Sequence, residues 1–453
     1  MSIDEVSAFL EQYPEVQTVE LLISDLNGVI RGKRIERELL EKVYTQGFCL
    51  PGSVMALDAT GTTVEETGLG AAEGDQDRIC HTVPGTLAIV PWQGEDRAQA
   101  LVSMFDAEGI NPFPADPRQV LRRVIDRFDS LGYSLGVAVE LEFYLVDMER
   151  DANGSLQPPI SPVSGRRMIS KQVYSMDDLD DYDFFIRDVL ETAHAQNLPA
   201  DTVIAEYAPA QFEVNLNYVN DPLTAADHAL LLKRVIRHVA KKHGMEATFM
   251  AKPYISEAGS GTHVHVSLLD KDGNNVLACD DPLSHPVMRH AMGGLLDMAD
   301  SVQALICPNI NSYRRLAPGA FAPTSKTWGY DNRTAALRIP SGDVKATRIE
   351  HRMSGADTNP YLAVAIVLAG IGEGLMSQIE PPPPIENNAY DQDHPALADN
   401  PRDALRAMEK DDRLKAWFGE EFLRIYSLCK WSEVRLFEHQ ITELEYSLLL
   451  PYL

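Results

Sequence analysis

The chain contains few cysteines, and their spacing predicts neither a disulfide framework nor a zinc site. The 453 residues include five cysteines, an odd number without a C-x-x-C pair, at positions 49, 80, 279, 307 and 429. Isolated cysteines of this kind are typical of free thiols in a reducing compartment, so we expect a cytoplasmic protein. Thiolate-bound zinc is not indicated either.

Long uninterrupted apolar runs are also missing. The most apolar stretch, residues 361–375, is interrupted by glycines, among them Gly370 and Gly372, and by Glu373, and is too short to span a bilayer, so it predicts a buried helix. The N-terminus, MSIDEVSAFLEQYPEV, is acidic and amphipathic and does not have the basic and apolar regions of a signal peptide. We therefore expect no membrane partner.

Basic residues are outnumbered, with 40 lysines and arginines against 67 aspartates and glutamates, which gives a net charge of -27 at pH 7. Such a surface repels phosphates, so we expect no nucleic-acid partner. The acidity is compatible with a cationic substrate, and equally with a role in solubility alone. The length exceeds that of one ordinary core and predicts two domains.

A proline-rich junction, NPFPADP at residues 111–117, separates the two expected domains. Before it, the pattern predicts a helix at 4–12, a hairpin of strands 19–24 and 29–35 around an Asn-Gly turn, a helix at 36–45, and strands at 86–91 and 100–106. After it, Asp116 and Pro117 predict a capped helix with an apolar stripe formed by Val120, Leu121, Val124, Ile125 and Phe128. Further helices are expected at 184–196 and 224–243.

Four later segments alternate polar and apolar side chains, which predicts strands with a polar face. The polar positions are Glu140 and Glu142; Gln211, Glu213 and Asn215; His263, His265 and Ser267; and Arg348, Glu350 and Arg352. A single strand of this type usually faces solvent. Four strands with complementary chemistry favour a shared site.

If these faces converge, the carboxylates of Glu140, Glu142, Glu206, Glu213 and Glu350 repel one another and need cations. Many oxygen ligands with one or two imidazoles suit Mg²⁺ or Mn²⁺ better than zinc, and a pair of such ions commonly clamps phosphate oxygens. The basic residues at positions 311–352 would then bind an anion. The residues alone therefore predict a two-metal, phosphate-handling site that also binds an anionic small molecule.

Taken together, these segments resemble the glutamine synthetase superfamily over nearly the whole chain. Six motifs occur in order: E-x-E at 140–142, E-x-A-P-x-Q-x-E at 206–213, G-S-G-x-H-x-H-x-S at 259–267, N-S-Y-x-R-L-x-P-G at 311–319, N-R-x-x-x-x-R-I-P at 332–340, and R-I-E-x-R at 348–352. The resemblance implies an α+β protein with the glutamine synthetase fold. In that fold, a small β-grasp N-terminal domain (1–108) precedes an α/β catalytic domain on a curved antiparallel sheet (109–453).

The resemblance also implies a role for each motif residue. Glu142, Glu206 and Glu213 would hold one metal, and Glu140, His263 and Glu350 the other. Glutamate would contact Gly259, Arg315 and Arg352, and ATP would contact His265, Ser267, Arg338 and Lys345, with Arg333 near the transferred phosphate. Arg333, Arg315 and Glu350 are the residues expected to act most directly on the reacting groups.

The implied activity is that of an ATP-dependent carbon–nitrogen ligase with two Mg²⁺ or Mn²⁺ ions per site. The γ-carboxylate of L-glutamate attacks ATP, and an amine then displaces phosphate from the γ-glutamyl phosphate. Family members assemble as stacked rings, so the resemblance implies a homo-oligomer, a dodecamer of two hexameric rings. The sites would lie between subunits, and the loop at residues 50–54 would come from the neighbour.

Two departures from the family pattern bear on the acceptor. Ammonia-using members have a Glu in the P-G-x-E-A-P flap and an Asp in the D-G-S loop, where this chain has Phe321 and Pro51. Both acids that would bind ammonium are missing, and an aromatic ring can face an alkylammonium group. We therefore expect a larger primary amine, with putrescine or another polyamine favoured, as in the γ-glutamylpolyamine synthetase branch that serves polyamine catabolism.

Three other acceptor classes stay open: ethanolamine, a monoamine, and ammonia itself if the two substitutions are neutral. No feature of the sequence measures the length of the acceptor. A structural relative without catalysis is disfavoured, because all six implied metal ligands are present.

Overall fold

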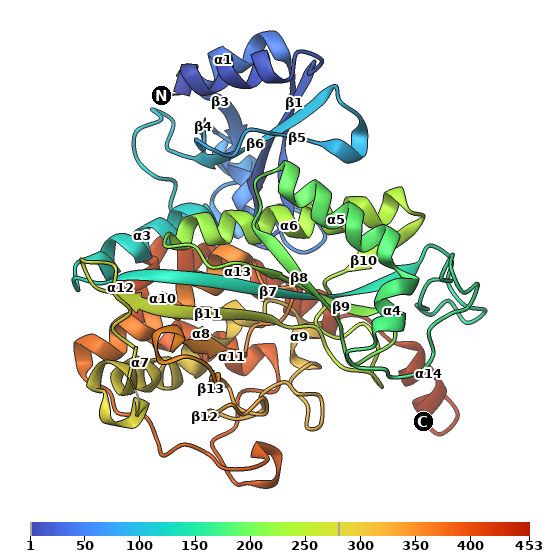
Figure 1. The fold of residues 1–453 in the computed structure, drawn as a ribbon, viewed down its shortest axis with the longest axis vertical. Coiled ribbons are helices and arrows are strands. Elements are labelled where there is room, and N and C mark those ends of the chain that lie inside the picture. The colour runs from blue at the N-terminus through green and yellow to red at the C-terminus, as the bar shows by residue number, and fades with distance from the viewer. Residues whose placement is uncertain (1, 280) are drawn as a thin grey trace.

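The structure, a computed structural model, describes residues 2–279 and 281–453, and two β-sheets of unequal size organise it. The described strands form a six-stranded N-terminal sheet and a larger eight-stranded sheet. In Figure 1 the N-terminal sheet lies above α5 (Asp183–Ala195) and α6 (Pro222–Lys242), and these helices lie above β7 (Ser134–Asp147). The expected combination of helices with two separate sheets is confirmed.

The N-terminal sheet has the strand order β2-β1-β6-β4-β3, with β5 paired to β6. Its strands are β1 (Thr18–Ser24), β2 (Ile30–Glu36), β3 (Phe48–Pro51), β4 (Asp77–Thr82), β5 (Ala88–Ile89) and β6 (Arg97–Met104). β1 is antiparallel to β2 and parallel to β6. The predicted hairpin is confirmed, whereas β3 and β4 have no counterpart in the sequence prediction.

Two helices accompany this sheet, α1 (Ser2–Gln12) and α2 (Leu40–Gln46). The prediction of a helix starting at residue 36 was wrong at its N-terminal end. β2 continues to Glu36, and a short 3-10 turn at Arg37–Leu39 comes before α2. The hydrogen bonds of β2 to β1 therefore override the local preference of these charged residues for a helix.

The larger sheet has the order β12-β13-β14-β11-β7-β9-β8, with β10 paired to β7. Besides β7 its strands are β8 (Ala200–Ala205), β9 (Gln211–Leu216), β10 (Met245–Thr248), β11 (Thr262–Leu269), β12 (Trp328–Tyr330), β13 (Leu337–Ile339) and β14 (Ile349–His351). Within the described residues, neighbouring strands of this sheet are antiparallel except β12 with β13. The antiparallel sheet that the family resemblance implies is confirmed, with β12 and β13 as its one parallel pair among the described strands.

Helix α3 (Pro117–Asp129) begins as the sequence predicts. The Asp116 carboxylate accepts a hydrogen bond of 2.8 Å from the backbone N–H of Arg118, and Pro117 occupies the first turn. This cap satisfies a backbone donor that the helix itself cannot pair. The five apolar residues of the predicted stripe are all buried.

Helix α10 (Pro360–Ser377) is the apolar core helix of the larger domain. Within the described part of the chain it is the one helix long and apolar enough to cross a membrane, and 83% of it is buried inside the protein. It packs against α7 (Pro286–Asp297) through glycines, because a Cβ on Gly294 would lie 2.1 Å from the carbonyl oxygen of Gly370. The prediction of a buried helix at 361–375 is confirmed.

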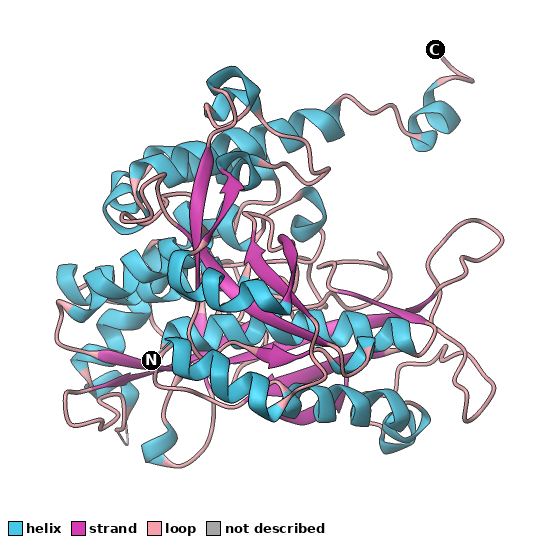
Figure 2. Ribbon diagram, turned by 90° about the horizontal axis from the view of Figure 1, so that it is seen from above, coloured by secondary structure: helices cyan, strands magenta, loops and turns pink. Residues whose placement is uncertain are grey.

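The remaining helices complete the described part of the chain. They are α4 (Met176–Asp181), α8 (Ala299–Ile306), α9 (Ile310–Tyr313), α11 (Pro401–Lys410), α12 (Asp412–Phe418), α13 (Glu420–Glu438) and α14 (Glu443–Leu449). Seen from above, the C-terminal segment with α14 extends away from the rest of the chain (Figure 2).

Buried polar contacts join α3, α6 and α10 to one another and join the start of α10 to β1. Arg118 donates two hydrogen bonds of 2.9 Å to the carboxylate of Asp227, which also accepts one of 2.6 Å from the Tyr361 hydroxyl. Asn359 donates to the Ser24 hydroxyl and to the backbone oxygen of Asp25. The boundary between residues 108 and 109 stays a prediction.

Candidate active site

The four predicted polar strands are neighbours in the larger sheet, in the order β14-β11-β7-β9. Glu140 on β7 pairs with His263 on one side and with Asn215 on the other. Glu142 lies opposite Glu213. Residues directly opposite in adjacent strands project from the same face of a sheet. The polar faces therefore converge as the sequence predicts.

Two adjoining cavities open on this face. The first, of about 410 Å³, is lined by most of the predicted site residues: Glu140, Glu142, Glu206, Glu213, Gly259, His263, Arg315, Phe321, Arg333, Arg338, Glu350 and Arg352. The second, of about 690 Å³, shares Glu140 with the first and is lined by His265, Ser267 and Lys345. Pro51 lies on β3 and lines neither cavity.

The carboxylates on the acidic side of the first cavity are buried and repel one another. Burial and, second to it, the neighbouring Glu142 carboxylate together raise the pKa of Glu206 to about 7. Burial also places the pKa of Glu213 well above its ordinary value, with added repulsion from Glu140, Glu142 and Glu206. Carboxylates that share a buried site without a cation hold protons for this reason. The arrangement suits a cation at this point.

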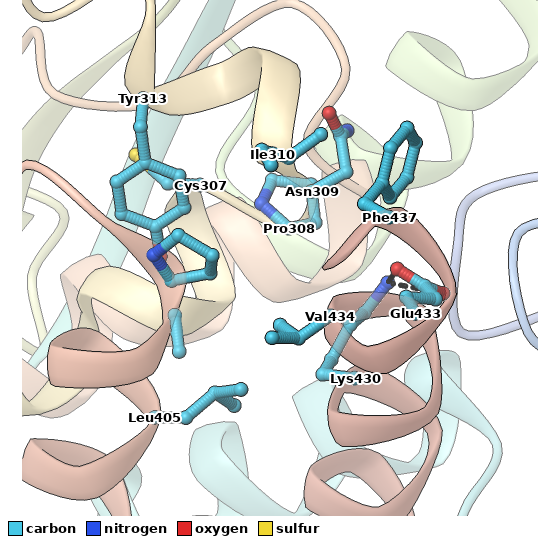
Figure 3. Close-up of a pocket in the computed structure, with 12 residues that line it drawn as sticks. Cys307, Pro308, Asn309, Ile310, Tyr313, Leu405, Lys430, Glu433, Val434 and Phe437 are labelled. Carbon is cyan, nitrogen blue, oxygen red and sulfur yellow. Dashed lines mark hydrogen bonds and ion pairs between the residues drawn. The ribbon is translucent and has the colours of Figure 1, made fainter. Parts of the chain in front are cut away.

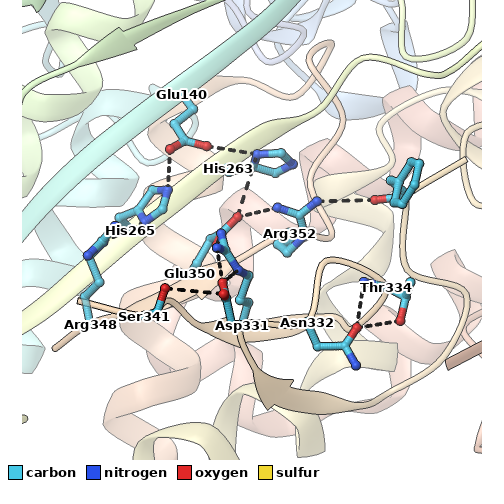
Figure 4. A network of polar contacts seen from close by, with 12 residues as sticks. Glu140, His263, His265, Asp331, Asn332, Thr334, Ser341, Arg348, Glu350 and Arg352 are labelled. Atoms are coloured by element: carbon cyan, nitrogen blue, oxygen red, sulfur yellow. Dashed lines mark hydrogen bonds and ion pairs between the residues drawn. The ribbon is translucent and has the colours of Figure 1, made fainter. Parts of the chain in front are cut away.

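Glu140 is held between two imidazoles (Figure 4). Its Oε2 lies 3.1 Å from His263 Nδ1, and its Oε1 lies 2.8 Å from His265 Nε2. Burial alone would raise the pKa of the Glu140 carboxyl, but the two histidines outweigh it and the pKa falls below the ordinary value. Arg348 Nε donates to His265 Nδ1 at 3.1 Å and so fixes the orientation of that ring.

Glu350 lies at the centre of the basic side and is 1% exposed. Its carboxylate accepts a hydrogen bond of 2.7 Å from Arg338 and another from Arg352. Burial opposes the charge, yet Arg352 and the two histidines outweigh burial and lower the pKa of Glu350 to about 2. Glu350 therefore stays ionised, and it joins the arginines to the imidazoles.

The carboxylate and imidazole atoms fit divalent cations. Within the part of the chain that the structure describes, three groups have ligand atoms within 4.8 Å of one another: Glu142 with Glu206 and Glu213; Glu140 with Glu213 and His263; and Glu140 with His265 and Glu350. The first group coincides with one implied ligand set. In the second implied set, His263 Nδ1 lies 3.1 Å from Glu140 and 4.0 Å from Glu350. His265, expected at ATP, lies as close to Glu140 as His263 does.

Gly259 and Arg315 are packed tightly together. A Cβ on Gly259 would lie 2.7 Å from Arg315 Cγ and 2.6 Å from the Ala251 carbonyl oxygen, so only glycine fits here. Arg315, 3% exposed, donates to the backbone oxygens of Met353 and Arg352 at 3.1 and 3.2 Å. Burial lowers the pKa of Arg315, although the Glu142 charge opposes this. Its guanidinium is thus fixed beside the cavity.

The mouth of the first cavity is aromatic, and sequence reasoning found only part of it. The rings of Phe321 and Tyr207 meet edge to face, with centroids 6.0 Å apart. Val173, Tyr174 and Ile204 line the same cavity. Tyr207 follows the predicted ligand Glu206 directly, so its place beside a motif residue was the one available signal.

A further cavity has different chemistry. A small one between α8, α9, α11 and α13 is lined mostly by apolar groups, with a Lys430–Glu433 ion pair of 3.0 Å at its side (Figure 3). It holds no group of acids comparable to the sheet face. The cavity with the carboxylates and arginines is therefore the candidate active site.

Comparison with known protein families and structures gives one consistent match. Residues 114–449 match the family model described as "Glutamine synthetase, catalytic domain". Among solved structures, one titled "GmaS/ADP complex-Conformation 1" superposes with a TM-score of 0.86 at 27% identity and covers 100% of both chains.

Two curated relatives align over almost the full length. "Gamma-glutamylputrescine synthetase PuuA" of Escherichia coli (strain K12) is 44% identical over 441 residues, 97% of this chain and 93% of that protein. "Gamma-glutamylethanolamide synthetase GlnA4" of Streptomyces coelicolor is 33% identical over 434 residues, 95% of this chain and 92% of that protein.

Proposed function

We propose that this chain, which belongs to the glutamine synthetase family, joins the γ-carboxylate of L-glutamate to putrescine or another polyamine at the expense of ATP. The protein is a carbon–nitrogen ligase of the glutamine synthetase type that forms a glutamate–amine bond. The observation that carries the choice of acceptor is the aromatic pair of Phe321 and Tyr207 at the mouth of the acidic cavity. The 44% identity to a gamma-glutamylputrescine synthetase supports the same choice.

In this proposal the sheet face holds two divalent cations, Mg²⁺ or Mn²⁺. Glu142, Glu206 and Glu213 would hold one, and Glu140, His263 and Glu350 the other. Bound there, the ions would neutralise phosphate oxygens and the charge that develops during phosphoryl transfer. The raised pKa values of Glu206 and Glu213 support this assignment, since both carboxyls gain from a nearby positive charge.

The substrates are assigned to the two adjoining cavities. Glutamate would lie in the first, against Gly259, Arg315 and Arg352, and ATP would lie in the second, against His265, Ser267 and Lys345. Arg333 and Arg338 line the first cavity. Arg338 would also contact ATP, and Arg333 would lie near the transferred phosphate. Glu140 lines both cavities, so the γ-carboxylate and the γ-phosphate would meet beside it.

The reaction then has two displacements. An oxygen of the γ-carboxylate attacks the γ-phosphorus of ATP, which forms γ-glutamyl phosphate and releases ADP. The amine nitrogen attacks the acyl carbon, the C–O bond to phosphate breaks, and the amide forms with loss of a proton from nitrogen. Arginines around the site lower the energy of both steps because they stabilise charge on the leaving oxygens.

The amine enters past Phe321, where the family's ammonia users have an acid. An apolar mouth favours an alkyl chain over hydrated ammonium, which loses its water shell on entry. We further propose that Pro51 of a neighbouring subunit completes this mouth in a dodecamer of two hexameric rings. Pro51 is on β3, away from both cavities of its own chain, which is compatible with such sharing.

A cytoplasmic role in polyamine catabolism completes the proposal. Cys49, Cys80, Cys307 and Cys429 are free thiols, as expected in a reducing compartment. Ethanolamine is the second candidate acceptor, because a gamma-glutamylethanolamide synthetase is 33% identical to this chain. The end of ethanolamine away from the reacting amine is an uncharged hydroxyl, whereas a diamine has a second ammonium there. Assays with both acceptors can therefore distinguish the two candidates.

The test is ADP release from ATP, Mg²⁺ and glutamate with ammonium, putrescine, cadaverine, spermidine, ethanolamine and simple alkylamines, with the product identified by mass spectrometry. We expect a γ-glutamylamide of a polyamine as the main product. γ-Glutamylethanolamide as the main product would favour ethanolamine as the acceptor. Glutamine as the main product would show that ammonia is the acceptor and would reject the proposed use of a larger amine.

A further inference from the structure

The side chain of Lys171 lies against the aromatic wall of the active-site cavity. Its Nζ is 5.3 Å from the centre of the Tyr207 ring and 3.2 Å from Glu257 Oε2. Lys171 belongs to the loop between β7 and α4, Tyr207 to the turn between β8 and β9, and Glu257 to the loop before β11. Two other segments thus flank the alkylammonium group of Lys171.

The Tyr207 ring connects this ammonium to the interior of the cavity. It lines the cavity and meets the Phe321 ring edge to face. Glu257 precedes Ala258, which also lines the cavity. A ring face and a carboxylate are the two groups that bind alkylammonium ions best in proteins. The location is continuous with the proposed entry path of the amine.

The side chains of Lys171 and Glu257 differ in their exposure to solvent. The side chain of Lys171 is 44% exposed and that of Glu257 is 23% exposed. Glu257 Oε1 accepts one hydrogen bond of 3.3 Å, from Ser256, and Lys252 donates to the Glu257 backbone oxygen. The Glu257 charge also interacts with the buried Lys252 ammonium. Lys171 is the exposed one of these two lysines and can swing into solvent, which leaves Oε2 of the more buried carboxylate without its ion-pair partner.

We propose that Tyr207 and Glu257 form a subsite for the distal ammonium of a diamine acceptor, and that Lys171 occupies this subsite when no acceptor is bound. The inference rests on the proposed function and deepens it. A lysine side chain is an ammonium on a four-carbon stem, which is the chemistry of one end of 1,4-diaminobutane. The reactive nitrogen would enter the cavity, the methylenes would lie along Phe321, and the far nitrogen would replace Lys171 Nζ.

The first test replaces the carboxylate. Steady-state KM values for putrescine and for n-butylamine, which has the same carbon chain and one amine, are measured for the full-length enzyme and for Glu257→Gln. We expect the ratio of the putrescine KM to the butylamine KM to rise by at least about tenfold, since a charge-assisted contact is lost for one acceptor only. The matched control is Glu246→Gln, which removes a carboxylate paired with Arg150 on the surface.

The second test removes the occupant. Lys171→Met keeps an unbranched side chain without its charge, so the same KM ratio should fall below that of the wild type. This position is on the surface, and the variant tests the subsite even if Glu257→Gln does not fold. An unchanged ratio in both variants, or a ratio that rises in Lys171→Met, overturns the subsite.

Acceptor preference of the wild-type enzyme distinguishes failure of the subsite from failure of the proposed function. If it uses putrescine and the variants change both KM values in parallel, the subsite is rejected and the proposed function stands. If it prefers ammonium to putrescine and butylamine, the proposed function fails, and the subsite fails with it.

Discussion

Glu142 on β7 lies directly opposite Glu213 on β9, so two carboxylates face each other across a buried strand pair. Like charges in this position destabilise a sheet. Burial and the surrounding acids place the pKa of Glu213 well above its ordinary value. The fold therefore maintains an unfavourable cluster of acids where the proposed activity needs cations, and the first two predictions follow from this cluster.

Glu213→Ala should reduce turnover with every acceptor to background, because it removes a proposed metal ligand. The same change should leave the metal-free protein at least as stable as the wild type, since it relieves repulsion in the acidic cluster. Turnover and the unfolding temperature in EDTA are the measurements. Glu246→Ala serves as the control, and substantial residual turnover in Glu213→Ala would show that the metals are bound elsewhere.

Stability without metal should fall as pH rises from about 4.5 to about 7. The folded protein holds the pKa of Glu206 at about 7, above the ordinary value of 4.5, because of burial and the Glu142 charge. The unfolded chain therefore loses this proton at lower pH than the folded chain, and the folded state is disfavoured across this window. Saturating Mg²⁺ should flatten the dependence. Unfolding temperatures from pH 4.5 to 8, with EDTA or Mg²⁺, test this, and curves that coincide would argue against a cation at Glu206.

Phe321→Glu should shift acceptor preference toward ammonium. The change returns a carboxylate to the mouth of the cavity, where it stabilises a small cation and can accept its proton. We expect the ratio of kcat/KM for ammonium to kcat/KM for putrescine to rise by about tenfold or more. Phe321→Leu keeps the mouth apolar and is the matched control. A ratio that rises equally in both variants would mean that ring size, and not charge, controls the choice.

Gly374→Ala should destabilise the core without touching the active site. A Cβ on Gly374 in α10 would lie 2.0 Å from the His290 backbone oxygen in α7, so the two helices must separate. We expect the free energy of unfolding to fall by roughly 1–3 kcal/mol, as for other overpacked cores. Thermal unfolding measures this. Gly342→Ala is the control, because its Cβ has no atom within 4 Å.

The sheet face was predictable because strand geometry has a period of two residues. Glu140 and Glu142, or His263 and His265, cannot alternate with apolar residues in a strand without sharing a face. Helix α3 was predictable for a similar reason, since Asp116 and Pro117 mark its first turn in the sequence. These features depend on residues close together in the chain.

Features that depend on distant segments were not predictable. Lys171, Tyr207 and Glu257 meet only because three loops converge, and no local pattern joins them. Strands β3 and β4 are short, and their pairing with each other and with β6 decides their structure more than their own residues do. The contact of His265 with Glu140 likewise depends on side-chain orientation across β7 and β11.

The most direct test of the whole account is the ratio of kcat/KM for putrescine to kcat/KM for ammonium, measured with the wild-type enzyme at saturating ATP, Mg²⁺ and glutamate. The account predicts a ratio of at least about 10², because the mouth lined by Phe321 and Tyr207 binds an alkyl chain and has Phe321 where ammonia-using members of the family have a Glu. A ratio of one or less would contradict it.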